Sequence, residues 1–290
     1  MANLKAIRKR IGSVKNTQKI TRAMKLVAGA RLRKAQMAIE ALRPYAVETM
    51  DVLSEVAARA GDDEAIHPLL ARREAKRVML VVLTSDRGLA GAFNASICRE
   101  AFRLWKTMEA EGKTVSLFVI GRKGNDYFKR RGANLDDGVP DQVFENLTWE
   151  MAEEIGTSII SRYEGGDLDS CIFVYNEFKS AIQQEVIVEP LLPITPSEKD
   201  EADMTDFIYE PGKRELLNNL IPMYVRVEVY RALLESVASE HGARMTAMDS
   251  ATNNASDMLD RLTLEFNRAR QAAITTELME IIGGAEALKG

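Results

Sequence analysis

The sequence predicts an α/β protein with two very long terminal helices, which pair as a left-handed coiled coil, and a small open α/β domain between them. Apolar residues recur about every 3.5 residues near both ends of the chain, which is the period of such a coil. No proline follows Pro222, so a second helix of roughly 60 residues, about 90 Å long, can form there. Between the ends, continuous apolar runs alternate with amphipathic stretches, as in a doubly wound sheet.

The N-terminal helix is predicted over residues 1–60. Its apolar seam consists of Leu4, Ile7, Ile11, Val14, Ala28, Leu32, Ala35, Ile39 and Leu42. The seam weakens at Gln18, Thr21 and Lys25, where we expect unwound helix or water. Pro44 interrupts the helix, but a helical stripe resumes after it, so we expect a kink rather than a stop. Residues 61–68 are a predicted loop.

The central domain is predicted over residues 75–195. Val78–Thr84 is a continuous, mostly β-branched apolar run, as expected for a parallel strand that is covered on both faces. The elements predicted after it are a helix at 92–111, a strand at 114–120, helices at 123–131 and 148–163, and strands at 171–178 and 181–191. A tight turn at Lys179 and Ser180 joins the last two strands. Residues 196–212 are predicted to be a linker.

The second long helix is predicted over residues 213–290. Its seam consists of Leu234, Val237, His241, Met245, Met248, Thr252, Ala255, Leu259, Leu262, Phe266, Ala269 and Ala273. Near its end the apolar residues spread over a wide sector, as in a helix that is buried on several sides. These residues are Ile274, Leu278, Met279, Ile281 and Ile282. Gly283 and Gly284 are expected to end the helix.

The net charge of −4 conceals a strong asymmetry. Residues 1–43 contain twelve Lys or Arg and the single acid Glu40, a net charge of +11, so the remaining residues carry −15. The N-terminal segment is therefore expected to face something acidic. With 46% hydrophobic residues the chain can bury a core. It has no apolar run near the ~20 residues of a membrane span and no secretory signal pattern, so we expect a protein made in a bacterial type of cytoplasm.

No catalytic or cofactor-binding constellation is evident. Thr84–Asn94 lies where a strand hands over to a helix, but it lacks both the GxGxxG spacing and the Lys and Ser/Thr of a Walker A loop. We expect a structural turn and no cofactor; a nucleotide-dependent enzyme built on the sheet is the alternative. His67 and His241 have no acids at ligand spacing, so no metal site is expected. Cys98 and Cys171 are predicted to be buried thiols in a reducing compartment.

The first helix carries a basic flank. At about 100° per residue, most of the basic residues from Lys5 to Lys34 fall in one sector of about 140° beside the apolar seam. This flank could be a solvated face, a set of phosphate contacts in a nucleic-acid module, or a contact surface for acidic protein loops. No aromatic residue precedes Tyr45 to stack on a base, which favours the acidic protein loops.

The amino-acid sequences of three segments resemble those of the gamma subunit of F-type ATP synthases. These segments are "ANLKAIRKRIGSVKNTQKITRAMKLVAGARLRKAQ", "TSDRGLAGAFN" and "RMTAMDSATNNASDMLDRLTLEFNRARQAAITTELMEIIGGAEAL". The resemblance covers the chain from end to end. It implies that the two helices form an antiparallel coiled coil, which acts as a central shaft, and that the small domain is Rossmann-like.

The resemblance further implies a rotor that couples proton translocation to ATP synthesis or hydrolysis and regulates ATPase activity and proton flow, without being catalytic itself. Its implied partners are the hexamer of alpha and beta subunits, the epsilon subunit and the c-ring, with no nucleic acid and no cofactor. It implies a peripheral protein on the cytoplasmic face of the bacterial inner membrane, which meets the membrane only through the complex. The redox switch of the chloroplast relatives should be absent.

Carried over residue by residue, the resemblance implies three groups of contacts with the beta subunit. The first faces an acidic loop, the second faces the catalytic ring, and the third hydrogen-bonds near the tip of the second helix. These groups are Met24, Lys25, Arg31, Arg33 and Lys34; Arg244; and Arg270, Gln271, Thr275 and Glu277. Alanine stands at Ala90 where relatives often have cysteine, and nothing functional depends on it.

Overall fold

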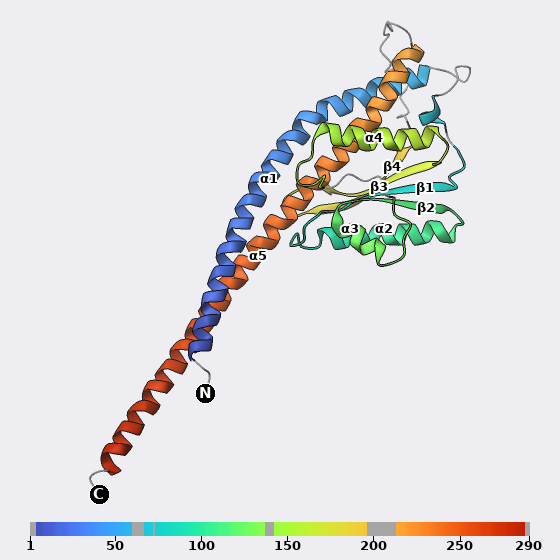
Figure 1. Cartoon of the computed structure of the whole chain (residues 1–290). Coiled ribbons are helices and arrows are strands. Elements are labelled where there is room, and N and C mark those ends of the chain that lie inside the picture. Colours follow the sequence, from blue (N-terminus) through green and yellow to red (C-terminus); the bar gives the residue numbers. More distant parts are fainter. Residues whose placement is uncertain (1–3, 60–66, 72, 137–141, 196–212, 288–290) are drawn as a thin grey trace. The chain divides into compact units, whose positions relative to one another are not determined.

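The computed structural model describes residues 4–59, 67–71, 73–136, 142–195 and 213–287 (Figure 1). Its elements are α1 (Leu4–Arg59), the 3-10 helix η1 (Pro68–Leu70), β1 (Arg77–Leu83), α2 (Phe93–Ala110), β2 (Thr114–Ile120), α3 (Arg122–Lys129), α4 (Trp149–Glu164), β3 (Ser170–Phe178), β4 (Gln184–Leu192) and α5 (Lys213–Ala287). The predicted fold class, long terminal helices with a small open α/β sheet, is confirmed.

The chain divides into two compact units. The described residues 4–28 and 245–287 form the two-helix unit, and residues 29–244 form the sheet unit. The predicted linker 196–212 and the loop residues 61–66 lie outside the described residues. Among the described residues, no helix combines the length and apolar character that a bilayer crossing requires.

The two helices of the two-helix unit run antiparallel. The Arg8 guanidinium lies 5.5 Å from the centre of the Phe266 ring, the hydroxyls of Thr21 and Thr252 are 2.8 Å apart, and Lys25 Nζ is 2.5 Å from Asp249 Oδ1. Residues later in α1 therefore contact residues earlier in α5. The seam side chains Ile7, Ala28, Met248, Ala255 and Leu262 are all buried, as the heptad pattern predicts.

The weak layer of the α1 seam does not unwind the helix, so the predicted unwinding was wrong. α1 is helical without interruption from Leu4 to Arg59, through both this layer and Pro44. Thr21, only 8% exposed, finds a partner in Thr252, and Lys25 finds one in Asp249. Since the side chains of Thr21 and Lys25 find their partners across the interface, the helix keeps its own hydrogen bonds.

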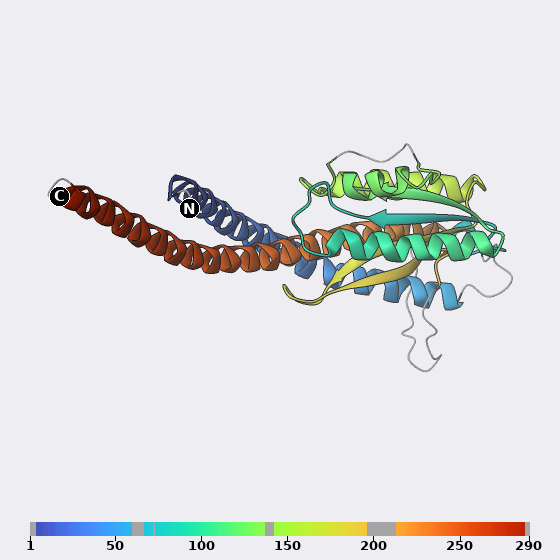
Figure 2. The same ribbon diagram turned by 90° about the horizontal axis from the view of Figure 1, so that it is seen from below.

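The end of α5 also differs from its prediction. The helix continues through Gly283 and Gly284 to Ala287. Glycine ends a helix only where the chain turns into the left-handed conformation, and the residues after this pair, alanine and glutamate, are good helix formers. In both views α5 continues beyond the start of α1 (Figures 1 and 2).

The sheet unit has four strands in the order β2-β1-β3-β4. β1 pairs parallel with both β2 and β3, while β4 pairs antiparallel with β3. Six of the seven residues of β1 are buried, as expected for a central parallel strand. α2 and α4 cover opposite faces of the sheet (Figure 1). This arrangement is the doubly wound topology that the alternation of strands and helices predicts.

The hairpin between β3 and β4 is longer than the predicted two-residue turn. β4 begins at Gln184, and Ser180 closes the loop, since its backbone N–H donates to Gln183 O and its hydroxyl accepts from Gln183 N. Ile182, which fits a strand by type, lies in this loop and is 84% exposed. The hydroxyl of Ser180 competes here with the strand ladder.

Candidate functional site

The predicted contact residues near the end of α5 are all exposed. Because Arg8 lies against Phe266 and α1 begins at Leu4, Arg270 is about level with the start of α1, and α5 continues beyond it with Gln271, Thr275 and Glu277. Large apolar side chains accompany them, with Ile274 48%, Leu278 53%, Met279 64%, Ile281 68% and Ile282 59% exposed. At about 100° per residue these five side chains cover a sector of about 160°. Such a broad exposed apolar surface marks an interaction site.

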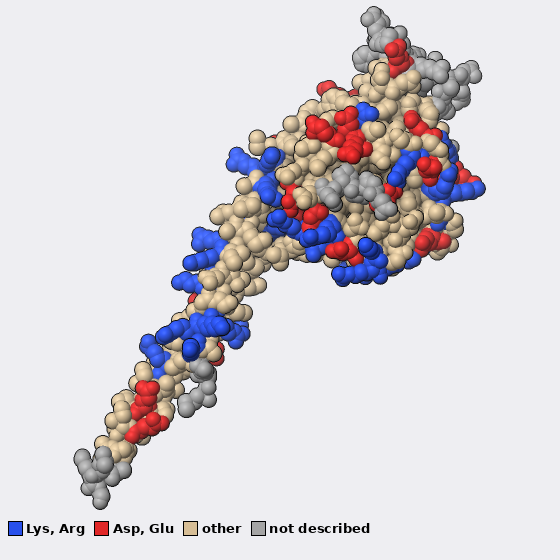
Figure 3. All heavy atoms as spheres, viewed as in Figure 1, with Lys and Arg blue, Asp and Glu red and all other residues tan. Residues whose placement is uncertain are grey.

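The predicted contact residues of the first group do not share one environment. Lys25 is engaged with Asp249 inside the two-helix unit, and Met24 beside it is half-buried. Arg31, Arg33 and Lys34 are exposed on α1, and none of them forms an ion pair with a residue that the structure describes. Lys and Arg side chains gather over the helices in Figure 3.

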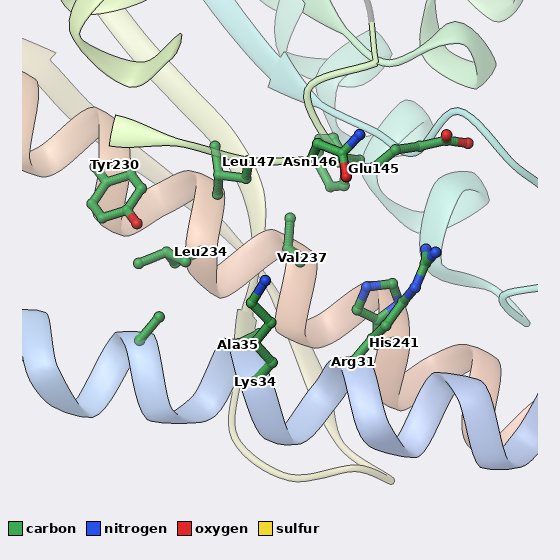
Figure 4. Close-up of a pocket in the computed structure, with 12 residues that line it drawn as sticks. Arg31, Lys34, Ala35, Glu145, Asn146, Leu147, Tyr230, Leu234, Val237 and His241 are labelled. Carbon is green, nitrogen blue, oxygen red and sulfur yellow. The ribbon is translucent and has the colours of Figure 1, made fainter. Parts of the chain in front are cut away.

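Arg31 and Lys34 line a cavity of about 280 Å³ in the sheet unit. Its walls come from α1, from α5 and from the segment that precedes α4 (Figure 4). From α5 it is lined by Tyr230, Leu234, Val237 and His241. Arg33 is not among its lining residues. The basic flank of α1 is therefore divided between an open surface and the edge of a cavity.

Arg244 differs from the other predicted contact residues because its side chain is buried and bonded inside the chain. Its Nη2 lies 2.6 Å from Glu240 Oε1, one helical turn earlier, and donates to Gly88 O at 3.3 Å. Its Nη1 lies 3.4 Å from His241 Nδ1. The residue therefore ties α5 to the turn after β1. The sequence contained a signal for this pair, an acid and an arginine four residues apart on one helix.

His241 is held neutral by this environment. Burial, and after it the guanidinium groups of Arg244 and Arg31, lower the pKa of His241 from its ordinary 6.5 to about 4. The side chain is only 5% exposed. The sequence analysis placed His241 only in the seam of the second helix and missed its position beside Arg244 and at the wall of the cavity.

The stability of the sheet unit should therefore depend on pH through His241. The folded-state pKa lies below the unfolded value, so the contribution is fully present above pH 6.5 and is lost as the pH falls towards 4. Between pH 7.5 and pH 5 we expect a loss of about 2 kcal/mol from this group. Urea unfolding of the chain and of His241→Gln at both pH values measures it. A drop of equal size in the variant would contradict the assignment, and His67→Gln serves as the control.

The turn after β1 is bonded to itself. Ser85 N donates to Asn94 Oδ1 at 2.9 Å and the Ser85 hydroxyl donates to Arg87 O at 2.7 Å. Leu89 and Gly91 adopt positive φ angles of 64° and 56°. The amide and the hydroxyl of Ser85 are thus used to hold the turn, which supports the structural interpretation of Thr84–Asn94.

The other groups that could carry chemistry are possible metal ligands and the two cysteines. No cluster of three or more His, Cys, Asp or Glu among the described residues could hold a metal ion. Cys98 and Cys171 are free and buried, as predicted. Burial raises the pKa of Cys98 to about 11 and that of Cys171 further, so neither thiol ionises near neutral pH.

Comparison with known proteins points in one direction. A family described as ATP synthase matches residues 3–288. The "ATP synthase gamma chain" of Sorangium cellulosum is 50% identical over 323 aligned positions, and that of Anaeromyxobacter sp. (strain Fw109-5) is 51% identical over 291, each with the whole of both chains covered.

Solved structures of similar fold include chains of mitochondrial ATP synthases. A chain of the central stalk and c-ring of Tetrahymena thermophila is 26% identical, with a TM-score of 0.58 over 80% of this chain and 99% of that one. A chain from the Euglena gracilis assembly of OSCP, F1 and c-ring has a TM-score of 0.66 at 18% identity, over 98% and 94% of the two chains, and supports the fold alone.

Proposed function

The chain belongs to the family of ATP synthase gamma chains, and from that membership we propose that it works as the central rotor shaft of an F-type ATP synthase. The observation that carries this role is the end of α5, where apolar side chains are exposed over a wide sector and none of the other helices that the structure describes lies beside them. Water is a poor environment for such a helix, whereas a protein sleeve that encloses it on several sides would bury these side chains.

The shaft would couple two sets of partners. Rotation of the c-ring would turn the chain, and its asymmetric surface would present different faces in turn to the beta subunits of the alpha and beta hexamer. Each face would stabilise a different state of the catalytic sites through a difference in contact energy, which any conformational coupling requires. ATP hydrolysis would drive the reverse rotation. In this proposal the chain is not catalytic; it regulates ATPase activity and proton flow through these contacts.

The contacts with the beta subunit are part of the proposal. The exposed cations Arg31, Arg33 and Lys34 would attract an acidic loop, and Arg270, Gln271, Thr275 and Glu277 would hydrogen-bond within the sleeve. Lys25 and Arg244 would contribute indirectly. Lys25 forms an ion pair with Asp249 and Arg244 forms one with Glu240, and these pairs would hold the surrounding contact surfaces in place. The epsilon subunit would bind the sheet unit. The chain would be a peripheral protein on the cytoplasmic face of the inner membrane, held there by the complex.

Assembly tests this proposal directly. When the chain is co-expressed with bacterial alpha and beta subunits, we expect one copy to enter each hexamer, measured by native mass spectrometry. A chain lacking residues 270–290 should enter less stably, because the enclosed part of α5 is gone. Failure of the full chain to join the hexamer, or nucleotide turnover by the chain alone, would contradict the proposal.

Charge reversal on α1 should uncouple rotation more than assembly. In the triple variant Arg31→Glu, Arg33→Glu, Lys34→Glu, we expect ATP-driven proton pumping by the assembled complex to fall about tenfold. The three new carboxylates would repel the acidic loop that the cations attract. Hexamer entry should persist. The matched control is the triple variant Arg99→Glu, Lys129→Glu, Arg130→Glu, which changes the charge equally at exposed residues of α2, of α3 and of the turn after α3. Normal pumping by the α1 variant would remove the proposed steering role.

A further inference from the structure

The cavity beside α1 offers hydrogen-bond donors without free acids. Arg31 and Lys34 line it, and neither has an ion-pair partner among the residues that the structure describes. The single acid in its lining, Glu145, is neutralised by Arg87, whose Nε lies 2.8 Å from the Glu145 carboxylate. Figure 4 shows the Glu145 carboxylate extending away from Lys34 and His241. The cavity is therefore positively charged.

His241 adds a directed donor to the same cavity. The ring atom Nδ1 of His241 lies 3.4 Å from Arg244 Nη1, which can only donate, and 3.3 Å from Glu240 Oε2, which can only accept. Only the contact with Arg244 has the geometry of a hydrogen bond, so Nδ1 is assigned as the acceptor and the proton of the neutral ring is assigned to Nε2. No residue that the structure describes accepts a hydrogen bond from Nε2, although the side chain is only 5% exposed and lines the cavity. Nε2 is not one of the fully buried side-chain atoms that lack a partner, so it opens onto the cavity, where a ligand or water would accept its hydrogen bond.

We propose that this cavity is a binding site for a small oxyanion of the phosphate class, held by Arg31, Lys34 and the Nε2–H of His241. Guanidinium, ammonium and imidazole N–H groups are the usual donors to phosphate oxygens, and bonds to a charged oxygen are the strong ones. A volume of about 280 Å³ admits a phosphate group with some of its water but not a whole nucleotide. The site is a property of the single chain and does not rest on the function proposed above.

Two sources of this oxyanion share the same chemistry, free phosphate and the phosphate tail of a nucleotide. The chain has only two histidines, His67 and His241, so ¹⁵N-labelled imidazole signals of the full chain can be followed individually by NMR. We expect the His241 Nε2–H signal to shift saturably with inorganic phosphate, with a Kd on the order of 1 mM, while the His67 signal stays in place. Sulfate should act similarly. ADP or ATP without magnesium acting at lower concentration would identify the nucleotide as the source.

Variants connect the shift to the site. Lys34→Gln with Arg31→Gln should weaken phosphate binding about tenfold or more, since charge-assisted bonds are lost. Arg33→Gln is the matched control, because Arg33 is exposed on the same helix but does not line the cavity. Potassium chloride at equal ionic strength should produce no saturable shift.

Several results would overturn the proposal. These are an Nδ1–H tautomer of His241, a shift that chloride reproduces, and equal phosphate affinity in the double variant. A response to a glutamate-rich peptide but not to phosphate would likewise overturn it and assign the cavity to an acidic protein loop. Hexamer entry of the same double variant, measured in parallel, reports on the rotor function independently of phosphate binding.

Discussion

Gly121→Ala is expected to destabilise the sheet unit by about 3–5 kcal/mol. Gly121 precedes α3 with a φ of 95°, and a Cβ there would lie 1.9 Å from the carbonyl oxygen of Thr84. That carbonyl cannot move away easily, because Thr84 is fully buried and its N–H donates to Ile120 O at 2.8 Å. The Thr84 hydroxyl also accepts from Gly124 N at 2.9 Å, so the shift would disturb the start of α3.

A second glycine separates two contributions to this loss of stability, the steric clash of the new Cβ and the strain of a positive φ angle. Gly112 has a φ of 82°, but nothing lies within 4 Å of a Cβ built there. Gly112→Ala should therefore cost only the backbone strain, about 1–2 kcal/mol. Urea unfolding followed by tryptophan fluorescence measures both, since Trp105 and Trp149 each lie in the sheet unit. Equal losses in the two variants would show that the Thr84 contact does not matter.

The order of the elements could be predicted from the sequence because apolar period and length report on burial directly. The second strand was predicted at both ends, Thr114 and Ile120, since a short and nearly continuous apolar run is a local property of the sequence. The length of the hairpin loop was not predicted correctly. Whether Ile182 lies in the strand or in the loop depends on the Ser180 hydroxyl and on what the loop packs against. The continuation of α5 through Gly283 was missed because glycine permits, rather than imposes, a stop.

The candidate site could be predicted from the sequence only for residues that are exposed on a single helix. The basic flank and the apolar end of α5 follow from patterns in one helix, and the structure leaves Arg33 and Leu278 exposed as such patterns suggest. The engagement of Arg244 with Gly88, and of Lys25 with Asp249, joins residues that are far apart in the sequence. Pairs of that kind depend on helix register and on the tertiary fold, which no single-helix pattern contains.

Removing the acid from the Arg244 pair should strongly destabilise the sheet unit. In Glu240→Gln, we expect a loss of about 3–5 kcal/mol, because a guanidinium stays buried without its counter-ion. The two side chains are 4% and 11% exposed, so water cannot replace the lost partner. By contrast, Glu100→Gln removes one side of the exposed Glu100–Arg103 pair on α2 and should cost no more than about 0.5 kcal/mol.

A double variant decides whether the pair or the buried charge is responsible. In Glu240→Met, Arg244→Met both charges are gone and similar volume remains, so we expect a loss well below that of Glu240→Gln. Some loss should remain, because Gly88 O and His241 Nδ1 no longer receive their bonds from Arg244. Urea unfolding at pH 7.5, where His241 is neutral, measures all three variants. A double variant less stable than Glu240→Gln would mean that the guanidinium stabilises α5 and the turn after β1 even without its carboxylate.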